Sequence, residues 1–347
     1  MIMTVAEALR QVTRELAPVA GEAARLEAEV LLAEVRKQSR AKLLSELRQE
    51  LGQEEQAALA ALVRRRLEGE PLAYLTGRRE FMSLEFLVNP AVLIPRPETE
   101  VLVERALRLL AQSRLPRPTV VDVGTGCGNI ALSLARYFPR ARVLAVDLSP
   151  AALAVARLNA QRLSLARRVA FYRGDLLHPL LGATGTTEKG PAWRAAFAPA
   201  GPRRRRLGCG GPPLAPQALG CCCPAARLSA GRRIRVDLVV ANLPYIPTGE
   251  LAGLPPEVRR EPRLALEGGA DGLDLYRRLL RQVPLILRPG GFLVVEMSPE
   301  QEAPLRRLLA EAGLVEIATV RDAGGRPRVL SGKFLVRRGR NRGNSVV

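Results

Sequence analysis

The residues best suited to chemistry lie in three groups along the middle of the chain. The first reads DVGTGCG over Asp122–Gly128. Its glycines allow a tight turn and a close approach of the backbone to a ligand, and a helix that follows them presents free amide groups. A dinucleotide site would want a glycine in place of Asn129, so the loop favours another nucleoside-like ligand. A plain strand-to-helix turn is the alternative interpretation.

The second group consists of two carboxylates that follow later apolar runs. Asp147 comes directly after such a run, where an acid accepts hydrogen bonds from ribose hydroxyls in nucleotide-binding α/β folds. Alone, it could also cap a helix that begins near Pro150. Asp175 follows Arg173-Gly174 and suits either an adenine amino group or an ordinary turn.

The third group is Asn242–Tyr245, which reads NLPY and follows the apolar run Val236–Ala241. It combines a side-chain amide, a proline that restricts the residue before it, and an aromatic ring. A strand end broken by proline would also explain this string.

Imidazole and metal chemistry have little support in the sequence. His178 is the only histidine of the chain, so a triad or a histidine-based metal site would rest on one residue. The five cysteines are Cys127, Cys209 and the run Cys221–Cys223, which lacks the spaced pairs of a zinc site. We therefore expect reduced thiols, no bound metal and an enzyme that works without imidazole.

The three groups need elements that bring them together, and the pattern from residue 119 onward supplies them. Short β-rich runs alternate there with helical patterns. The runs are Thr119–Val123, Arg142–Val146, Val169–Tyr172, Val236–Ala241 and Gly291–Val295, with helical patterns at Ile130–Tyr137 and Ala151–Leu163. This order predicts an α/β doubly wound sheet, whose ligands bind beyond the carboxyl ends of the strands.

The first part of the chain has a helical pattern instead. Thr4 and Glu7 make a capping box at a helix start. Further helical patterns cover Ala24–Val35, Leu43–Leu51 and Ala57–Leu67. They predict a small antiparallel helix bundle, which carries no catalytic constellation and therefore suits recognition or positioning.

A different pattern joins these two parts. Phe86–Val88 and Val92–Ile94 flank Asn89-Pro90, which predicts a short hairpin around a turn. The next residues, Arg96–Glu100, place a proline and acids where a first helical turn favours them.

Composition and charge bound the class of protein. The 347 residues are 47% hydrophobic and 25% charged, typical of a globular protein of about two domains. Apolar runs too short to span a bilayer and an N-terminus without a signal-peptide pattern favour a cytoplasmic protein. Most of the net charge of +19 falls between His178 and Val236 and after Ser331. GC-rich coding explains this arginine excess, and weak attraction to RNA or the ribosome is the alternative.

The stretch from Leu181 to Gly231 interrupts the alternating pattern. It is rich in Gly, Pro, Ala and Arg and has almost no periodicity. A loop of this length within a compact domain is usually disordered or functional, and we interpret it as a disordered insertion.

Several strings together resemble one family of enzymes. The glycine loop, the two strand-end acids and NLPY are similar to those of S-adenosylmethionine-dependent methyltransferases that act on a planar nitrogen. Pro71–Gly77, Leu93–Glu100, Glu261-Pro262 and Ala265–Leu273 narrow the resemblance to the peptide chain release factor N5-glutamine methyltransferases (the PrmC/HemK family). The similarity extends from about Thr4 to Leu335, without the insertion.

The resemblance implies an architecture and a division of the chain. The fold would be a Rossmann-like class I methyltransferase sheet with a small N-terminal helical bundle. Residues 1–78 would recognise the substrate, residues 79–96 would form a hairpin linker, and residues 97–338 would form the methyltransferase domain. The insertion at 181–231 and a basic tail at 339–347 lie outside this common pattern.

The resemblance also implies a role for each site residue. The cofactor would contact Gly124, Thr125, Gly126, Cys127, Gly128, Asp147, Asp175, Leu176 and Asn242. Asn242, Leu243, Pro244 and Tyr245 would receive the glutamine of the Gly-Gly-Gln loop of class I peptide release factors. The Asn242 side-chain oxygen and the Leu243 carbonyl would then accept hydrogen bonds from the amide, and Tyr245 would cover its plane.

One departure and several alternatives remain. Leu243 stands where the family usually has proline, although any residue there supplies the carbonyl and Pro244 still favours an extended backbone at Leu243. The same chemistry on a ribosomal-protein glutamine, or on adenine N6 in DNA or rRNA, is an alternative in which the positive charge would be functional. A non-catalytic RNA-binding relative is another.

Overall fold

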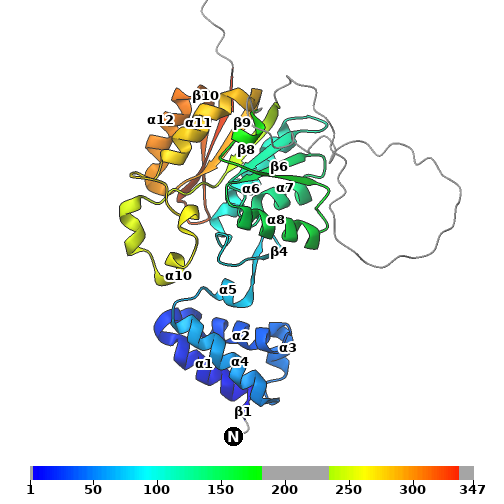
Figure 1. Cartoon of the computed structure of the whole chain (residues 1–347), viewed down its shortest axis with the longest axis vertical. Coiled ribbons are helices and arrows are strands. Elements are labelled where there is room, and N and C mark those ends of the chain that lie inside the picture. The colour runs from blue at the N-terminus through cyan, green and yellow to red at the C-terminus, as the bar shows by residue number, and fades with distance from the viewer. Residues whose placement is uncertain (1–2, 182–233, 336–347) are drawn as a thin grey trace, which may run out of the picture.

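The computed structural model describes residues 3–181 and 234–335, which form a group of helices and a larger α/β unit (Figure 1). The insertion expected at 181–231 therefore lies, except for Leu181, outside the described residues. The expected tail at 339–347, Cys209 and Cys221–Cys223 lie outside them as well. Among the residues that the structure describes, no helix is both long and apolar enough to span a membrane.

The first group is helical, as the sequence predicts (Figure 1). The capping box is present, because Glu7 N donates to Thr4 Oγ1 at 3.3 Å and Thr4 N donates to Glu7 Oε2 at 2.8 Å. Apolar side chains of these helices form one buried cluster. The helices are α1 (Val5–Ala20), α2 (Ala24–Val35), α3 (Arg40–Ser45), α4 (Gln53–Leu67) and α5 (Leu72–Thr76).

The helix predicted over Leu43–Leu51 is wrong after Ser45. Helix α3 ends at Ser45, and β2 (Glu50–Leu51) pairs antiparallel with β1 (Met3–Thr4). The pairing buries Leu51 in the helical cluster, so tertiary packing decides the conformation there.

The hairpin predicted around Asn89-Pro90 is also misplaced. The hairpin lies earlier in the chain, where β3 (Arg78–Phe81) pairs with β4 (Leu84–Leu87). Both turn residues, Met82 and Ser83, have positive φ angles of 49° and 53°, as a two-residue hairpin turn requires. These residue types give no turn signal, whereas Asn89-Pro90 makes a turn after which the chain does not pair.

A seven-stranded sheet forms the centre of the α/β unit, with the order β10-β11-β9-β8-β5-β6-β7. The strands from β5 to β9 pair in parallel, which confirms the predicted doubly wound class. Their bounds are β5 (Thr119–Val123), β6 (Arg142–Asp147), β7 (Val169–Arg173), β8 (Val236–Ala241) and β9 (Leu287–Glu296).

Two antiparallel strands that the sequence analysis did not predict complete the sheet. They are β10 (Leu314–Arg321) and β11 (Pro327–Phe334), and β11 pairs with both β9 and β10. Proline, glycine and charged residues in β11 weaken its local β signal, so its pairing on both sides determines the strand.

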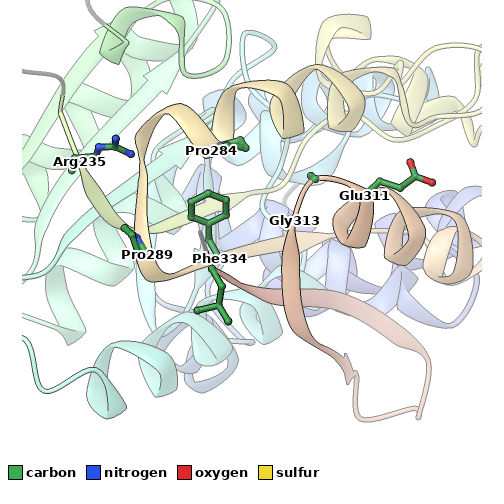
Figure 2. A pocket seen from close by; sticks show the side chains of 8 residues that line it. Arg235, Pro284, Pro289, Glu311, Gly313 and Phe334 are labelled. Atoms are coloured by element: carbon green, nitrogen blue, oxygen red, sulfur yellow. The ribbon is translucent and has the colours of Figure 1, made fainter. Parts of the chain in front are cut away.

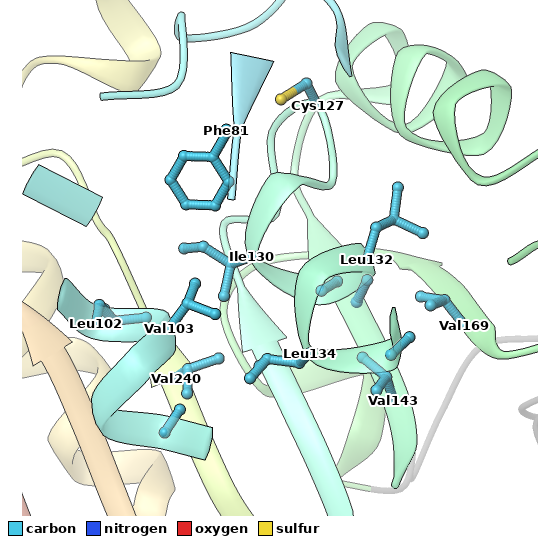
Figure 3. Close-up of a cluster of buried hydrophobic side chains, with 14 of the residues drawn as sticks. Phe81, Leu102, Val103, Cys127, Ile130, Leu132, Leu134, Val143, Val169 and Val240 are labelled. Carbon is cyan, nitrogen blue, oxygen red and sulfur yellow. The ribbon is translucent and has the colours of Figure 1, made fainter. Parts of the chain in front are cut away.

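Helices cover both faces of the sheet. One face packs against α6 (Glu98–Gln112), α7 (Asn129–Tyr137) and α8 (Pro150–Arg162), in the cluster of Figure 3. The other packs against α11 (Asp274–Ile286) and α12 (Glu302–Glu311). Phe81 and Phe86 of the hairpin belong to the first cluster. Their rings pack edge to face, with the ring centroids 6.2 Å apart. This packing fixes the strand ends that carry the candidate site.

Candidate active site

The three groups of residues singled out in the sequence meet at one edge of the sheet. In the parallel registers, Val123 lies opposite both Val146 and Ala241, and Ala241 lies opposite Val295. The residues that follow these positions therefore leave the sheet side by side. They are the glycine loop after β5, Asp147 at the end of β6, and Asn242 after β8.

The glycine loop packs against the NLPY segment. Gly124 has φ +75°, and a Cβ there would lie 3.3 Å from Leu243 Cδ2. Gly126 also has a positive φ, of +54°, but a Cβ there would meet no atom within 4 Å. The loop is therefore closed toward Leu243 and open at Gly126, where a ligand can approach the backbone.

A buried hydrogen-bond network centred on Asp122 stabilises the glycine loop. Asp122 Oδ2 accepts hydrogen bonds from Thr125 Oγ1 at 2.6 Å and from Ala131 N at 3.1 Å. Burial raises the pKa of Asp122 to about 7. Thr125 is itself 2% exposed, so its side chain serves the loop and not a ligand.

Cys127 and Gly128 also help to fix the conformation of the glycine loop. Asn159 Nδ2 donates to Cys127 O at 2.9 Å and to Leu87 O at 3.0 Å, which ties the loop to the hairpin. Burial raises the pKa of the Cys127 thiol to about 12, so it is not a nucleophile. A Cβ at Gly128 would lie 3.3 Å from Ala156 Cβ, because the loop packs closely on α8.

Asp147 connects the second strand end to the loop. Its Oδ2 accepts from Gly126 N and its Oδ1 from Ser149 N, both at 2.8 Å. Burial raises its pKa, and these backbone hydrogen bonds oppose the rise. Each carboxylate oxygen can accept a second hydrogen bond. Asp147 and the open backbone at Gly126 thus fit the ribose of an adenosyl group.

Asp175 and Leu176 follow β7 at the same edge. The Asp175 carboxylate forms an ion pair with Arg278 of α11, a contact that the sequence analysis missed. Leu176 is buried, with a positive φ of 50°. Arg278 therefore occupies part of the hydrogen-bonding capacity of the Asp175 carboxylate, and only the remaining capacity is available to a ligand.

The Asn242 side chain is held from α6. Its Nδ2 donates to Thr99 Oγ1 at 3.1 Å, and the residue is partly exposed. The amide nitrogen thus points to the protein, and Asn242 Oδ1 is left as an acceptor. Leu243 is buried, and Tyr276 Oη lies 3.4 Å from its carbonyl but donates a shorter bond, of 2.6 Å, to Glu296 O. The Leu243 carbonyl therefore keeps capacity for another donor.

Pro244 and Tyr245 are partly buried, and a glycine-rich segment fixes the backbone of Tyr245. Gln301 Nε2 donates to Tyr245 O at 2.9 Å, and a Cβ at Gly272 would lie 2.1 Å from that same oxygen. A Cβ at Gly268 would lie 2.7 Å from Tyr245 Cα. The string around Gly268–Gly272, known from the sequence only as part of a resemblance, therefore allows close backbone approach.

The hairpin region and the segment after β8 are also joined. Glu261 is 5% exposed and accepts from Ile94 N at 3.0 Å and from the Arg96 guanidinium. Burial raises the pKa of Glu261, whereas the charge of Arg96 opposes the rise. Two strings that lie far apart in the sequence thus meet beside the site.

The same segment includes α10 (Pro256–Arg259), which lies on the side of the α/β unit nearest the N-terminal helices (Figure 1). Arg66 of α4 is 5% exposed, and it donates to both carboxylate oxygens of Glu27, at 2.7 and 3.0 Å. It also pairs with Glu257 of α10 at 2.9 Å. Arg66, buried against Glu27, therefore links the helices to the segment that follows NLPY through an ion pair with the partly exposed Glu257.

A pocket of about 430 Å³ lies elsewhere, at the opposite ends of the strands (Figure 2). Its lining includes Arg235 just before β8, Gly313 just before β10, and Phe334 at the end of β11. Arg235 donates to Leu287 O at 3.3 Å. The pocket brings together none of the residues singled out for chemistry.

The doubly wound sheet and its strand-end site define a class I methyltransferase. A family model described as a methyltransferase domain matches residues 120–186, and one described as the PrmC N-terminal domain matches residues 7–77. The release factor glutamine methyltransferase of Moorella thermoacetica is 42% identical, covering 94% of this chain and 97% of its own length. That of Geobacter sulfurreducens is 37% identical, covering 96% and 98%. The chain belongs to the release factor glutamine methyltransferase family.

Proposed function

We propose that the protein transfers a methyl group from S-adenosylmethionine to the side-chain amide nitrogen of a glutamine in class I peptide release factors. The observation that carries this proposal is the orientation of Asn242. Thr99 holds its amide nitrogen at 3.1 Å, so its oxygen is available beside the glycine loop. Family membership supports the choice of substrate.

The cofactor roles follow from the strand-end geometry. The backbone of Gly124–Gly128 would contact the adenosyl and methionine parts, and Asp147 would accept the ribose hydroxyls. Asp175 and Leu176 would lie by the adenine ring, with Asp175 sharing its carboxylate with Arg278. S-adenosylmethionine supplies a methyl group on a sulfonium.

An amide nitrogen is a poor nucleophile because its lone pair is delocalised, so the enzyme must orient it. Asn242 Oδ1 and the Leu243 carbonyl would accept its two hydrogens and stabilise the positive charge that develops on nitrogen. Pro244 restricts the carbonyl of Leu243, and Tyr245 would cover the amide plane. In this orientation the lone pair of nitrogen would form the new N–C bond while the C–S bond of the sulfonium broke with its electrons left on sulfur, and the nitrogen would then lose a proton to water.

The N-terminal helices are proposed to recognise the release factor. Residues 1–78 would form this unit, residues 79–96 its connection, and residues 97–338 the methyltransferase domain. The ion pair of Arg66 with Glu257 supports this role, because it joins the helices to the segment after NLPY. Attraction of the basic segments to the ribosome would act in addition, and it would weaken with salt.

A substrate comparison tests the proposal. The protein is incubated with S-adenosylmethionine labelled in its methyl group and with one of three partners: a class I release factor, the same factor with its Gly-Gly-Gln glutamine replaced by alanine, or purified ribosomes. Label in the parent factor alone supports the proposal. Equal labelling of the alanine variant, or preferential labelling of ribosomes, contradicts it.

A further inference from the structure

A buried carboxylate that neither the sequence nor the family match singles out lies directly behind the proposed substrate site. Glu296 is the last residue of β9 and is 2% exposed. Because Ala241 pairs with Val295, Glu296 and Asn242 leave neighbouring strands together. Beside it, Asn242 Nδ2 donates to Thr99 Oγ1 at 3.1 Å, and hydrogen bonding by these two side chains lowers the pKa of the carboxylate. Its Oε2 has no hydrogen-bond partner among the described residues.

Such a carboxylate is costly to keep. A buried polar atom without a partner lowers stability, and an ionised carboxylate in the interior lowers it more unless the carboxylate is paired. An apolar residue would serve a merely structural role better at this position. The cost points to a task in the site.

We propose that Glu296 is a positioning residue that, together with Thr99, fixes the orientation of the Asn242 amide. The inference rests on the proposed function, since the amide it orients is the one that receives the substrate. Glu296 acts through Thr99 and Asn242, and it needs no contact with the substrate itself.

The number of hydrogens on each group fixes this orientation. An ionised carboxylate accepts hydrogen bonds and donates none, and a threonine hydroxyl has a single proton. When Thr99 donates that proton to Glu296, its oxygen can only accept from Asn242, so the nitrogen of Asn242 must face Thr99. Without Glu296, the hydroxyl can donate to Asn242 Oδ1 instead, and the amide can turn over. The reversed amide would present a donor to the substrate nitrogen.

The surroundings of Glu296 make this orientation depend on pH. Burial raises its pKa to about 7, while hydrogen bonds from Thr99 and the charge of Arg328 on β11 lower it. Glu98 of α6 raises it further. Burial and the charge of Glu296 in turn raise the pKa of Tyr245 and of Tyr276. The ionised, orienting form therefore predominates above about pH 7 and is lost as the pH falls.

The test compares steady-state methylation of a release factor by four variants. E296Q keeps the size of the side chain but removes the charge, and T99V removes the hydroxyl that T99S keeps. D237N is the matched control, since Asp237 is a buried carboxylate, 8% exposed, near the start of the neighbouring strand β8. Binding of S-adenosylmethionine is measured for each variant by calorimetry, and kcat and KM are measured between pH 6 and 9.

We expect E296Q and T99V to lose about 10- to 100-fold in kcat, by analogy with the loss when the hydrogen-bond partner of a metal ligand is removed. Their KM and their affinity for S-adenosylmethionine should change by less than about threefold. T99S should retain most of the parent kcat, and D237N should keep the parent kcat whatever its stability. The parent kcat should rise with pH to a plateau above about 7, and the E296Q profile should lack this step.

Parent kcat in either E296Q or T99V, or equal losses in T99V and T99S, would overturn the inference. A parent enzyme that methylates the release factor while E296Q matches it refutes only the role of Glu296. A parent enzyme that binds S-adenosylmethionine but labels no release factor refutes the proposed function instead.

Discussion

Replacing Asp147 by alanine probes the adenosyl site most selectively. The carboxylate accepts backbone hydrogen bonds from Gly126 and Ser149, both at 2.8 Å, and would accept the ribose hydroxyls with its remaining capacity. A hydrogen bond to a charged group contributes about 1.5–3 kcal/mol. Loss of the ribose contacts, together with a looser Gly126, should weaken S-adenosylmethionine binding by about 1–3 kcal/mol. That corresponds to a Kd roughly 5- to 150-fold higher.

Isothermal titration calorimetry on the folded variant measures this change. Ser149→Ala is the matched control: it removes the side-chain cap of α8, where Ser149 Oγ accepts from Ala152 N at 3.2 Å, but keeps the backbone bond to Asp147. It should lower the melting temperature, as the loss of about 1 kcal/mol of capping predicts, and leave the Kd unchanged. An unchanged Kd in folded Asp147→Ala, or equal weakening in both variants, would refute the assignment.

Three further changes test the catalytic segment and its support. Asn242→Ala should lower kcat by about 10²- to 10³-fold with nearly unchanged binding of S-adenosylmethionine; parent turnover in a methylation assay would contradict the mechanism. Leu243→Pro should leave kcat equal or modestly higher, because the carbonyl is retained; activity that rises from undetectable to robust would instead identify the parent chain as a disabled enzyme. Arg66→Ala leaves Glu27 buried without its partner and should destabilise the protein by about 3–5 kcal/mol in denaturant unfolding. Arg65→Ala is its control, because the Arg65 side chain is 48% exposed and its pair with Glu70 is worth at most about 1 kcal/mol; equal losses would show that the link through Arg66 carries no special weight.

The strands that position the site were predictable because each is a short run in which apolar, mostly β-branched residues predominate. Thr119–Val123 and Val236–Ala241 match their predicted bounds, since strands covered on both faces leave little ambiguity. The hairpin was misplaced because its turn, Met82-Ser83, has no turn residues. Strand β11 was missed because its β conformation depends on pairing partners distant in sequence.

The site was predictable where the residue type itself indicates the role, as with the glycines of the loop and the side-chain amide of Asn242. It was not predictable where the task depends on burial. Glu296 has the local sequence of any strand-end acid, and only the fold shows that it is enclosed beside Thr99 and Asn242. Arg278 likewise meets Asp175 only through the packing of α11.

The account depends most on which atom receives the methyl group. A class I release factor that has been incubated with the protein and S-adenosylmethionine can be digested and sequenced by tandem mass spectrometry, with Asn242→Ala as the control enzyme. We expect one added methyl group, on the side-chain nitrogen of the Gly-Gly-Gln glutamine, and almost none with the control. A methyl group on another residue, or equal methylation by the control, would contradict the account.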